Sequence, residues 1–398
     1  MSTINKASDL KAGVIGTGFI GPVHIEALRR IGVAVTAICG SEQAREVADR
    51  WGIPQVFTGY DVERFLAEAE MDVVHITSPN RHHHGQALAA LAAGKHVVCE
   101  KPLAMTSAQT AEIVAAAEAS GKVFAVNYNI RFYPAVLQLR ALARSGEMGE
   151  IIHVNGSYMQ DWLHKDTDYN WRVLASEGGE LRAVGDIGTH WLDTVCFILG
   201  SPVDELIADL SIFHRTRQRP VGEVQTFSST GSSNVVDPSA GPTETKQICS
   251  VDTEDFANVL LAFASGARGN LSVSQVAAGR KNSLRIEIYG SKKSAWWCSE
   301  DPEVLHLGNR DGANETAIRA TPSFGTGAQG FMDYPPGHVE GFPDTFKMNF
   351  RNIYAAIVNG PGERLFATAR DGHQEVALCE AILRSHRSRS WTKVGARY

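Results

Sequence analysis

The chain has 398 residues, more than one hydrophobic core usually supports, so we expect two domains. Its formal net charge of -6 lacks the basic surplus of nucleic-acid-binding proteins, and six scattered cysteines without a CxxC pair exclude a disulfide framework or a cysteine zinc site. No apolar run is long enough to span a bilayer, and residues 1–9 hold no signal-peptide core. We therefore expect a cytoplasmic protein without a membrane or nucleic-acid partner.

The first apolar run, residues 12–15, leads into a glycine-rich turn typical of dinucleotide-binding proteins. The turn reads Gly16-Thr17-Gly18-Phe19-Ile20-Gly21 and precedes a predicted helix over residues 22–30. In such a turn the first glycine allows a tight bend, the second lets a pyrophosphate approach the backbone, and the third permits close helix–strand packing. Free amides at the helix start then face the phosphates. This pattern predicts dinucleotide binding.

The second predicted strand, residues 33–38, decides which nucleotide the sequence favours. It ends in Cys39-Gly40-Ser41, without the acid that commonly binds the ribose of NAD. Small residues, the Ser41 hydroxyl and Arg45 on the next helix leave room for a 2′-phosphate. Glu42 keeps NAD open, because its carboxylate belongs either to the ribose pocket or to the helix N-terminus. The sequence favours NADP over NAD.

Polar groups follow the next two predicted strands. Residues 73–76 are followed by Thr77-Ser78-Pro79-Asn80 and three adjacent histidines, residues 82–84. Adjacent side chains at a helix start point in different directions, so we expect one or two ligand-facing histidines and no metal. Strand 96–99 ends in Glu100-Lys101-Pro102. Parallel sheets bind ligands beyond the carboxyl ends of their strands, which predicts a functional Lys101. The alternative is a surface lysine.

A further predicted strand, residues 123–126, ends in another polar run. Tyr128, Asn129 and Arg131 follow it and point to the same crevice. Arg131 has two interpretations that the sequence does not separate. It is either a ligand-binding group or one half of an ion pair at the domain joint.

From residue 129 onward the pattern changes to alternating, half-exposed strands, which predicts a second domain of α+β type with an open antiparallel sheet. Ser265-Gly266 is a hairpin signal between two of these strands. Residues 216–246 and 308–330 are expected to be long loops, and helix 369–386 is long enough to pack back across the domain joint. The predicted strands are 151–158, 258–264, 267–275 and 284–289.

One predicted helix in this domain, residues 185–199, carries a polar stripe. Asp186, His190 and Asp193 stand at i, i+4 and i+7 and share a face, while the rest of the helix is apolar. A polar stripe on such a helix needs a partner, because unpaired burial is costly. The alternative to a catalytic role is a satisfied Asp–His pair that only stabilises the helix.

Aromatic and hydrogen-bonding residues alternate in three further segments. Residues 158–162, 170–172 and 334–342 mix Trp or Tyr with amides, acids, Arg or His. Sugar rings are bound in this way, because their apolar faces stack on aromatic rings and their hydroxyls meet polar groups. These segments therefore indicate a site for a sugar ring.

The chain resembles the glucose–fructose oxidoreductase / inositol dehydrogenase / rhizopine catabolism (Gfo/Idh/MocA) family over nearly its whole length. The resemblance rests on the glycine turn, Thr77-x-Pro79-Asn80, Glu100-Lys101-Pro102 and Asp186-x-Gly188-x-His190-x-x-Asp193. The segments 160–162 and 171–172 look like the branch of levoglucosan and related pyranoside dehydrogenases. The chain departs from the family before the aspartate helix, where Gly178-Gly179 is followed by Glu180 in place of a third glycine.

The resemblance implies a Rossmann domain over residues 1–128 and a substrate-binding and oligomerisation domain over residues 129–398, with homodimers or homotetramers built through the open sheet. It also implies hydride transfer between NAD(P) and a secondary alcohol of a sugar, glycoside or cyclitol. The expected catalytic set is Lys101, Asp186 and His190. Lys101 and His190 share the substrate hydroxyl, and which of them accepts the proton is open.

The remaining expected contacts divide into two groups. Cofactor contacts are expected from Gly16, Gly18, Phe19, Ile20, Gly21, Ser41, Arg45, Thr77, Pro79, Asn80, His84, Glu100, Lys101 and Asn129. Substrate contacts are expected from Lys101, Tyr128, Arg131, Gln160, Trp162, Trp171, Arg172, Asp186, His190 and His338. Two alternative functions stay open, a glycosidase that recycles NAD through oxidation, elimination and reduction, and a non-catalytic dinucleotide-binding sensor.

Overall fold

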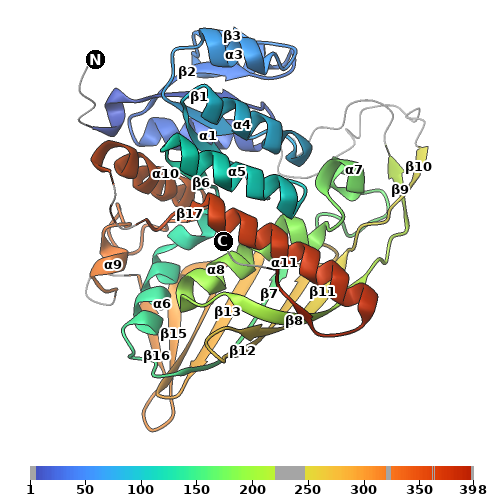
Figure 1. The fold of residues 1–398 in the computed structure, drawn as a ribbon. Helices are drawn as coiled ribbons and strands as arrows, with labels where there is room; N and C mark the ends of the chain where they lie inside the picture. The colour runs from blue at the N-terminus through green and yellow to red at the C-terminus, as the bar shows by residue number, and fades with distance from the viewer. Residues whose placement is uncertain (1–5, 220–246, 320–323, 361, 363, 396–398) are drawn as a thin grey trace. The chain divides into compact units, whose positions relative to one another are not determined.

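A computed structural model describes residues 6–219, 247–319, 324–360, 362 and 364–395. These residues divide into two compact units (Figure 1). Unit 1 consists of the chain up to Phe132 together with Gly341–Val376, and unit 2 consists of Tyr133–Glu340 and the chain from Ala377 onward. Most of the predicted loop 216–246 lies outside the described residues. No helix in the described ranges has the length and apolar character needed to cross a membrane.

Unit 1 is built on a seven-stranded sheet in the order β17-β6-β5-β4-β1-β2-β3, in which only β17 is antiparallel to its neighbour within the described chain. Its strands are β1 Lys11–Ile15, β2 Ala34–Cys39, β3 Gln55–Phe57, β4 Val73–Ile76, β5 His96–Cys99, β6 Phe124–Val126 and β17 Ala367–Thr368. Its helices are α1 Ile20–Arg30, α2 Ala44–Trp51, α3 Val62–Glu68, α4 His83–Ala92, α5 Ser107–Ser120 and α10 Phe342–Asn359. Every residue of β4 is buried, as expected for a parallel strand covered on both faces.

The strand order explains why unit 1 has a ligand crevice. Strand β1 lies between β2 and β4, so the chain leaves β1 in one direction and later returns to its other side. Ligands bind beyond the carboxyl ends of the strands at such a switch point. The glycine turn follows β1 and the Thr77 segment follows β4, which places both motifs at this point.

Unit 2 is built on a nine-stranded, mostly antiparallel sheet in the order β16-β15-β14-β13-β7-β12-β11-β8-β18. Strands β7 and β12 pair in parallel, in contrast to the other neighbours described. The predicted fold class, a Rossmann domain followed by an α+β domain with an open sheet, is confirmed. The strands are β7 Ile151–Met159, β8 Val203–Ser211, β11 Phe256–Phe263, β12 Arg268–Ser274, β13 Ser283–Gly290, β14 Lys293–Cys298, β15 Asp301–Asn309, β16 Glu315–Ile318 and β18 Thr392–Lys393.

Helices α6 Pro134–Arg144 and α8 Thr189–Leu199 pack on this sheet. The side chain of Trp191 on α8 is fully buried, and its indole N–H donates to the carbonyl of Arg285 on β13 at 2.8 Å. Gly156 on β7 makes room for this ring, because a Cβ there would lie 2.1 Å from the indole nitrogen. The space at Gly156 thus lets Trp191 hold α8 close to the sheet.

The other elements of unit 2 are short, apart from α11. They are α7 Ala175–Gly178, α9 Thr326–Gln329 and the two-stranded pair β9 Thr216–Arg219 and β10 Gln247–Ser250. Helix α11, Ala369–Ser388, begins in unit 1 and ends in unit 2.

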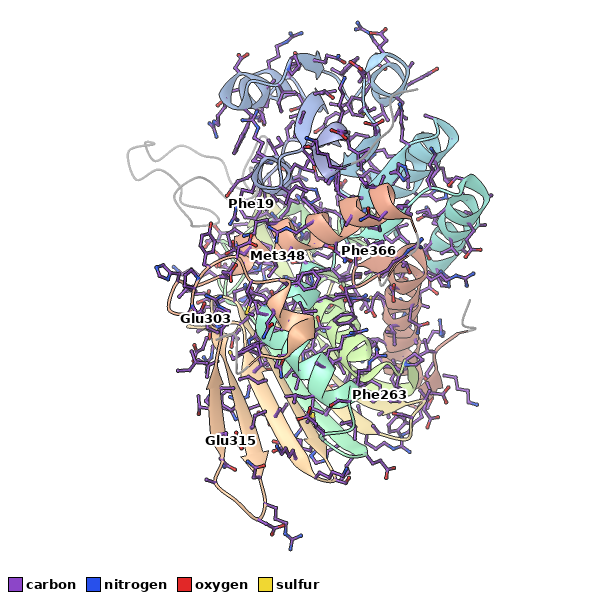
Figure 2. The ribbon with its side chains drawn as sticks, turned by 90° about the vertical axis from the view of Figure 1, so that its left-hand side faces the viewer. Phe19, Phe263, Glu303, Glu315, Met348 and Phe366 are labelled. Atoms are coloured by element: carbon purple, nitrogen blue, oxygen red, sulfur yellow. The ribbon has the colours of Figure 1, made fainter. Side chains whose placement is uncertain are left out.

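Three expectations of local structure were wrong. Residues 308–330 are not one loop, because β16 pairs with β15 in a hairpin and α9 follows; Figure 2 labels Glu303 and Glu315 on these two strands. Residues 216–219 form strand β9. The helix over 185–199 is not uniform, because Val184–Gly188 is a π-helical turn and α8 begins only at Thr189. The hydrophobic pattern carries no signal for the wider turn.

Candidate active site

The glycine turn of unit 1 has the steric features of a dinucleotide cradle. Gly16 has φ +108°, and a Cβ there would lie 2.6 Å from the backbone of Thr77. A Cβ on Gly21 would lie 2.4 Å from the carbonyl oxygen of Gly16, so α1 can pack this closely only with glycine. A Cβ on Gly18 would meet no atom within 4 Å. The space at Gly18 is the open side of the cradle, and these residues fit a bound dinucleotide.

The Thr77 segment is tied directly to this turn. The hydroxyl of Thr77 donates to the carbonyls of Ile15 and Gly16 at 2.9 and 3.1 Å. Pro79 precedes a short 3-10 helix that begins at Asn80. Phe19 precedes α1 and is 43% exposed. The two loops at the switch point therefore form one connected rim.

The three adjacent histidines point in different directions, as the sequence predicted. His83 is fully buried, and its two ring nitrogens face the carbonyls of Ser78 and Pro102, both at 2.8 Å. His84 pairs at 2.8 Å with Glu112, whose side chain is 63% exposed. His83 joins the segments after β4 and β5, a role that the sequence analysis did not assign. In the described part of the chain, no group of three His, Cys, Asp or Glu residues is arranged to hold a metal.

The segment after β2 carries no buried acid. Strand β2 ends at Cys39, and the hydroxyl of Ser41 accepts from the backbone N–H of Gln43 at 3.3 Å. The carboxylate of Glu42 lies 3.9 Å from Arg45, and their side chains are 78% and 67% exposed. Glu42 therefore stands in a solvent-exposed ion pair at the start of α2.

At the end of β5, Glu100 is buried and Lys101 is half-buried. The backbone N–H of Lys101 donates to the Glu100 carboxylate at 3.2 Å, and the Lys101–Pro102 peptide bond is cis. Burial alone would raise the pKa of Glu100, but the hydrogen bond and charge of His24, with Asn127 and Lys101, lower it to about 2. Glu100 is thus a buried anion beside Lys101.

The residues that follow β6 are buried in unit 1. The amide of Asn129 donates to the hydroxyl of Thr345 at 2.6 Å. Arg131 pairs with Asp371 at 3.3 Å, and this pairing contributes to lowering the pKa of Asp371 against the effect of burial. Tyr128 is 1% exposed. Of the two interpretations of Arg131, the ion pair is present within unit 1, and the substrate contact stays a prediction.

In unit 2, Asp186 lies on the π-helical turn and is held from two sides. Its carboxylate accepts from Arg172 Nε at 3.2 Å and from Gln275 Nε2 at 2.9 Å. Gln275 is buried at the end of β12 and was not predicted as a site residue. π-Helical turns occur frequently at functional sites, because they re-aim one side chain on an otherwise regular helix.

His190 is 9% exposed and its ring meets Tyr158 edge-on at 6.4 Å between centroids. Burial raises the pKa of the Tyr158 phenol far above its usual range, so this group stays neutral. Its hydroxyl donates to Asn282 Oδ1 at 2.7 Å. Asp193 is 1% exposed, so His190 and Asp193 are both buried members of the predicted stripe.

Two of the three predicted sugar-binding segments, 158–162 and 170–172, join this cluster. The Gln160 amide donates to Asn282 at 2.8 Å, and the Trp162 indole N–H donates to Gln160 at 2.8 Å. The guanidinium of Arg172 lies over the Trp171 ring at 4.3 Å. Aromatic faces, amides, a guanidinium and a carboxylate are therefore connected to the helix of Asp186 and His190.

A buried charge cluster fixes the start of this helix, and the sequence analysis missed it. The carboxylate of Glu254 accepts from the backbone N–H groups of Arg182 and Val184 at 2.9 and 2.8 Å. Burial raises the pKa of Glu254 to about 7, although these donors and Arg182 favour its anion. Asp255 pairs with the fully buried guanidinium groups of Arg182 and Arg217.

The cluster also holds the segment that precedes the helix. Arg217 donates to the carbonyls of Leu163, Lys165 and Asp168 at 2.7 to 2.9 Å. Thr253 donates to the carbonyl of Val173 at 3.0 Å. The chain between the two sugar-binding segments is thus anchored to the same core as the π-helical turn.

His338 lies apart from these groups in the described contacts of unit 2. Its side chain is exposed in a loop whose carbonyls accept from the buried guanidinium of Arg319. Arg319 also pairs with Glu303 and Glu340, both at 2.6 Å. A substrate contact from His338 stays a prediction.

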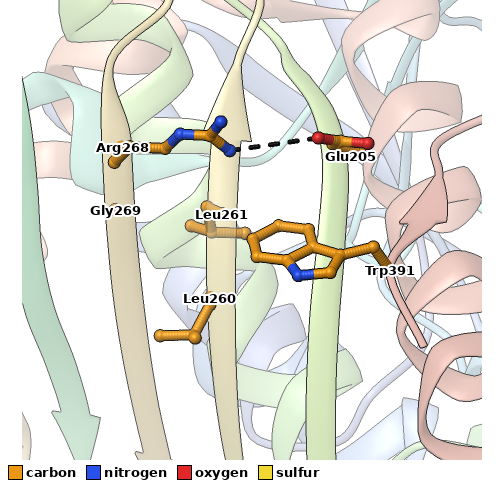
Figure 3. A pocket seen from close by; sticks show the side chains of 6 residues that line it. All are labelled: Glu205, Leu260, Leu261, Arg268, Gly269 and Trp391. Carbon is orange, nitrogen blue, oxygen red and sulfur yellow. Dashed lines mark ion pairs between the residues drawn. The ribbon is translucent and has the colours of Figure 1, made fainter. Parts of the chain in front are cut away.

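The sheet of unit 2 has a hollow of about 440 Å³ that is separate from this cluster (Figure 3). An ion pair between Arg268 and Glu205 at 3.9 Å crosses it, and Leu260 and Trp391 are 52% and 45% exposed. The residues that line the hollow include neither Asp186 nor His190. It contains no acid–base pair suited to catalysis, so the candidate active site is the Asp186–His190 cluster.

Two segments of the chain match models of known protein families. Residues 10–128 match the model of an oxidoreductase family with an NAD-binding Rossmann fold, and residues 136–296 match the GFO/IDH/MocA C-terminal domain. Levoglucosan dehydrogenase of Pseudarthrobacter phenanthrenivorans is 28% identical over 97% of this chain and 98% of its own length. A structure of levoglucosan dehydrogenase with NADH and levoglucosan has a TM-score of 0.84, at 26% identity over 97% of this chain and all of that one. D-glucoside 3-dehydrogenase of Escherichia coli is 34% identical over 51% of this chain and 57% of its own length.

A Rossmann unit with a dinucleotide cradle, followed by a sheet domain with an Asp–His helix, defines an NAD-binding oxidoreductase. The chain belongs to the Gfo/Idh/MocA family, whose N-terminal and C-terminal domains it carries in order. The resemblance stated from its motifs is confirmed.

The open space at Gly18 generates a prediction. Gly18→Ala is expected to weaken NAD and NADP binding at least roughly tenfold, or about 1.4 kcal/mol, because the methyl group occupies the side that the pyrophosphate approaches. Its melting temperature should stay unchanged, since the methyl group meets no protein atom. Gly21→Ala is the matched comparison and should lower the melting temperature as well. Nucleotide titration and thermal unfolding measure both, and undiminished nucleotide affinity in Gly18→Ala would contradict the assignment of the cradle.

Proposed function

We propose that this protein is an NAD(P)-dependent dehydrogenase that oxidises a secondary alcohol of a sugar, glycoside or cyclitol. The observation that carries the proposal is the cluster in unit 2. There Asp186 is bonded to Arg172, which stacks on Trp171, and the ring of His190 meets Tyr158, which joins Gln160 of segment 158–162 through Asn282. This composition suits a polyhydroxylated ring, with aromatic faces for its apolar side and amides and charges for its hydroxyls. The levoglucosan and glucoside dehydrogenases among its relatives support the same substrate class.

The proposed chemistry assigns one role to each residue of the catalytic set. The nicotinamide, when bound, accepts the hydride from the alcohol carbon. His190 takes the hydroxyl proton, since imidazole titrates near neutral pH. Lys101 donates a hydrogen bond to the same oxygen and stabilises its developing negative charge. Asp186 orients the substrate side of the site, because Arg172 and Gln275 fix its carboxylate.

For the cofactor, we propose that NADP binds at least as well as NAD. The support is the chain after β2, which carries the Ser41 hydroxyl and, in an exposed ion pair with Glu42, the guanidinium of Arg45; a 2′-phosphate would take the place of Glu42 on this guanidinium. The relatives with bound NADH show that the fold also accepts NAD-type nucleotides in those proteins. We further propose homo-oligomers through the sheet of unit 2, supported by exposed Leu260, Trp391 and Ile152 on its strands and edge.

A substrate screen tests the function. Pyranosides, anhydrosugars and inositols should reduce NAD or NADP far faster than linear alcohols or 2-hydroxy acids, because only cyclic polyols use both the aromatic and the polar groups of unit 2. Absorbance of the reduced nicotinamide measures the rate with each cofactor. Turnover of lactate with none for cyclic polyols would refute the proposal. Glycoside cleavage without net reduced nicotinamide would favour a cofactor-recycling glycosidase.

The catalytic set is tested by three variants. Lys101→Ala and His190→Ala should each lower kcat by ~10²–10⁴-fold, the usual cost of losing an acid–base group. The double variant should be scarcely worse than the poorer single variant, because groups acting as a unit are not additive. Nucleotide affinity should survive in all three. A silent Lys101→Ala, together with a His190→Ala that lowers the melting temperature more than kcat, would show that both residues are structural.

A further inference from the structure

A chain of hydrogen bonds between buried side chains runs through unit 1 and ends at Glu100. The hydroxyl of Tyr354 on α10 lies 3.0 Å from His75 Nε2 on β4. His75 Nδ1 lies 3.0 Å from His24 Nδ1 on α1, and His24 Nε2 lies 2.9 Å from Glu100 Oε1. His24 and His75 are completely buried. Neither histidine has a role in the function proposed above.

The donor at the Glu100 end of these hydrogen bonds follows from the chemistry of the carboxylate. The Glu100 carboxylate can only accept, so His24 Nε2 carries a proton. Burial lowers the pKa of His75 well below its usual range, and the neighbouring His24 adds to this effect, so His75 is neutral. The Nδ1 atoms of His24 and His75 share the next hydrogen bond, and His75 Nε2 shares the last one with the Tyr354 hydroxyl. The three side chains therefore form one continuous chain of hydrogen bonds that ends in a donor to Glu100.

Further polar and aromatic side chains surround Glu100 and His24 at the end of this hydrogen-bonded chain. The amide of Asn127 donates to the same Glu100 oxygen, and Asn349 donates to Asn127 at 2.8 Å. The rings of Phe346 and Phe350 lie edge-on to His24 at 5.7 and 4.8 Å. The residues that face Glu100 with a titratable group are His24, Lys101, His83 on α4 and Cys99 on β5.

Such a chain is costly to build for stability alone. Buried ionised groups lose their hydration, and apolar side chains of similar volume often stabilise a fold as well or better. A buried carboxylate with a strongly shifted pKa beside a candidate catalytic lysine is instead typical of a functional site.

We propose that His24 and His75 are positioning residues for Lys101, because they hold the Glu100 carboxylate ionised and fixed at the turn that carries this lysine. The proposal rests on the proposed function, in which Lys101 acts on the substrate oxygen. Glu100 supplies the counter-charge and also accepts the backbone N–H of Lys101 at 3.2 Å. His24 orients the carboxylate, and His75 with Tyr354 holds the ring of His24 in place.

Two substitutions of His24 separate its hydrogen bond to Glu100 from its hydrogen bond to His75. The amide of His24→Gln reaches the former Nε2 position and still donates to Glu100, whereas that of His24→Asn reaches only the former Nδ1 position. His24→Asn should lower kcat roughly 10- to 100-fold, since small misplacements of a catalytic group cost up to ~10²-fold. The acidic limb of its kcat–pH profile should move to higher pH, because Glu100 without its donor takes up a proton more readily. His24→Gln should keep most of the activity and the wild-type limb.

Two further measurements complete the test. His96→Asn, at the opposite end of β5, removes an imidazole from the same unit and should leave kcat unchanged. Carbon-13 NMR of labelled glutamate carboxyls, with Glu100 assigned through Glu100→Gln, reports the charge of Glu100 without any turnover. Its signal should stay that of the anion between about pH 4 and 8 in the wild type and titrate in His24→Asn.

The outcomes distinguish this proposal from the proposed function. Equal losses in His24→Asn and His24→Gln, or a lower melting temperature with an unchanged kcat–pH profile, would show that the chain is only structural. A Glu100 signal that titrates identically in wild type and His24→Asn would also overturn the proposal. A wild-type protein that oxidises no sugar would contradict the proposed function, and the Glu100 titration would still decide whether His24 keeps the carboxylate ionised.

Discussion

The candidate site of unit 2 depends on two adjacent buried acids, Glu254 and Asp255. Glu254 binds the backbone at the start of the π-helical turn, and Asp255 neutralises Arg182 and Arg217. Removing one partner of such a buried pair typically costs ~3–5 kcal/mol, because the other charge is left uncompensated. These buried interactions hold backbone N–H groups in place, which hydrophobic contacts do not do. The turn that aims Asp186 is held by this cluster.

In unit 1 a buried acid likewise lies beside the candidate catalytic residue, Lys101. Glu100 is a buried anion that hydrogen bonds keep ionised, and it lies next to Lys101 in the chain. Lys101 and Asp186 are partly accessible, while the acids that fix their segments of backbone, Glu100 in unit 1 and Glu254 with Asp255 in unit 2, are buried. This arrangement gives a flexible side chain a defined position, because its buried neighbours cannot reorganise without losing hydrogen bonds.

The sequence predicted those features whose cause is local. Gly16 and Gly21 are glycines because neighbouring backbone leaves no room for a Cβ, and this requirement is visible in the spacing of the motif. The contacts of Asp186 with Gln275 and of Val184 with Glu254 join residues 89 and 70 positions apart, and no single-sequence pattern connects them. His84 was chosen as a cofactor contact and the buried role of His83 was not foreseen, because which histidine is buried depends on where α4 begins. The sequence also did not show that Gly341–Val376 belongs to unit 1. The amphipathic pattern of α10 does not indicate which elements it packs against.

The central claim is that the hydrogen bound to the alcohol carbon of the ring passes as hydride directly to the nicotinamide. The most direct measurement uses the best cyclic substrate with deuterium at the oxidised carbon and follows the label by mass spectrometry and NMR. The account predicts one deuterium per turnover at C4 of the reduced nicotinamide and none in water. Deuterium released to water, with an unlabelled nicotinamide, would contradict it.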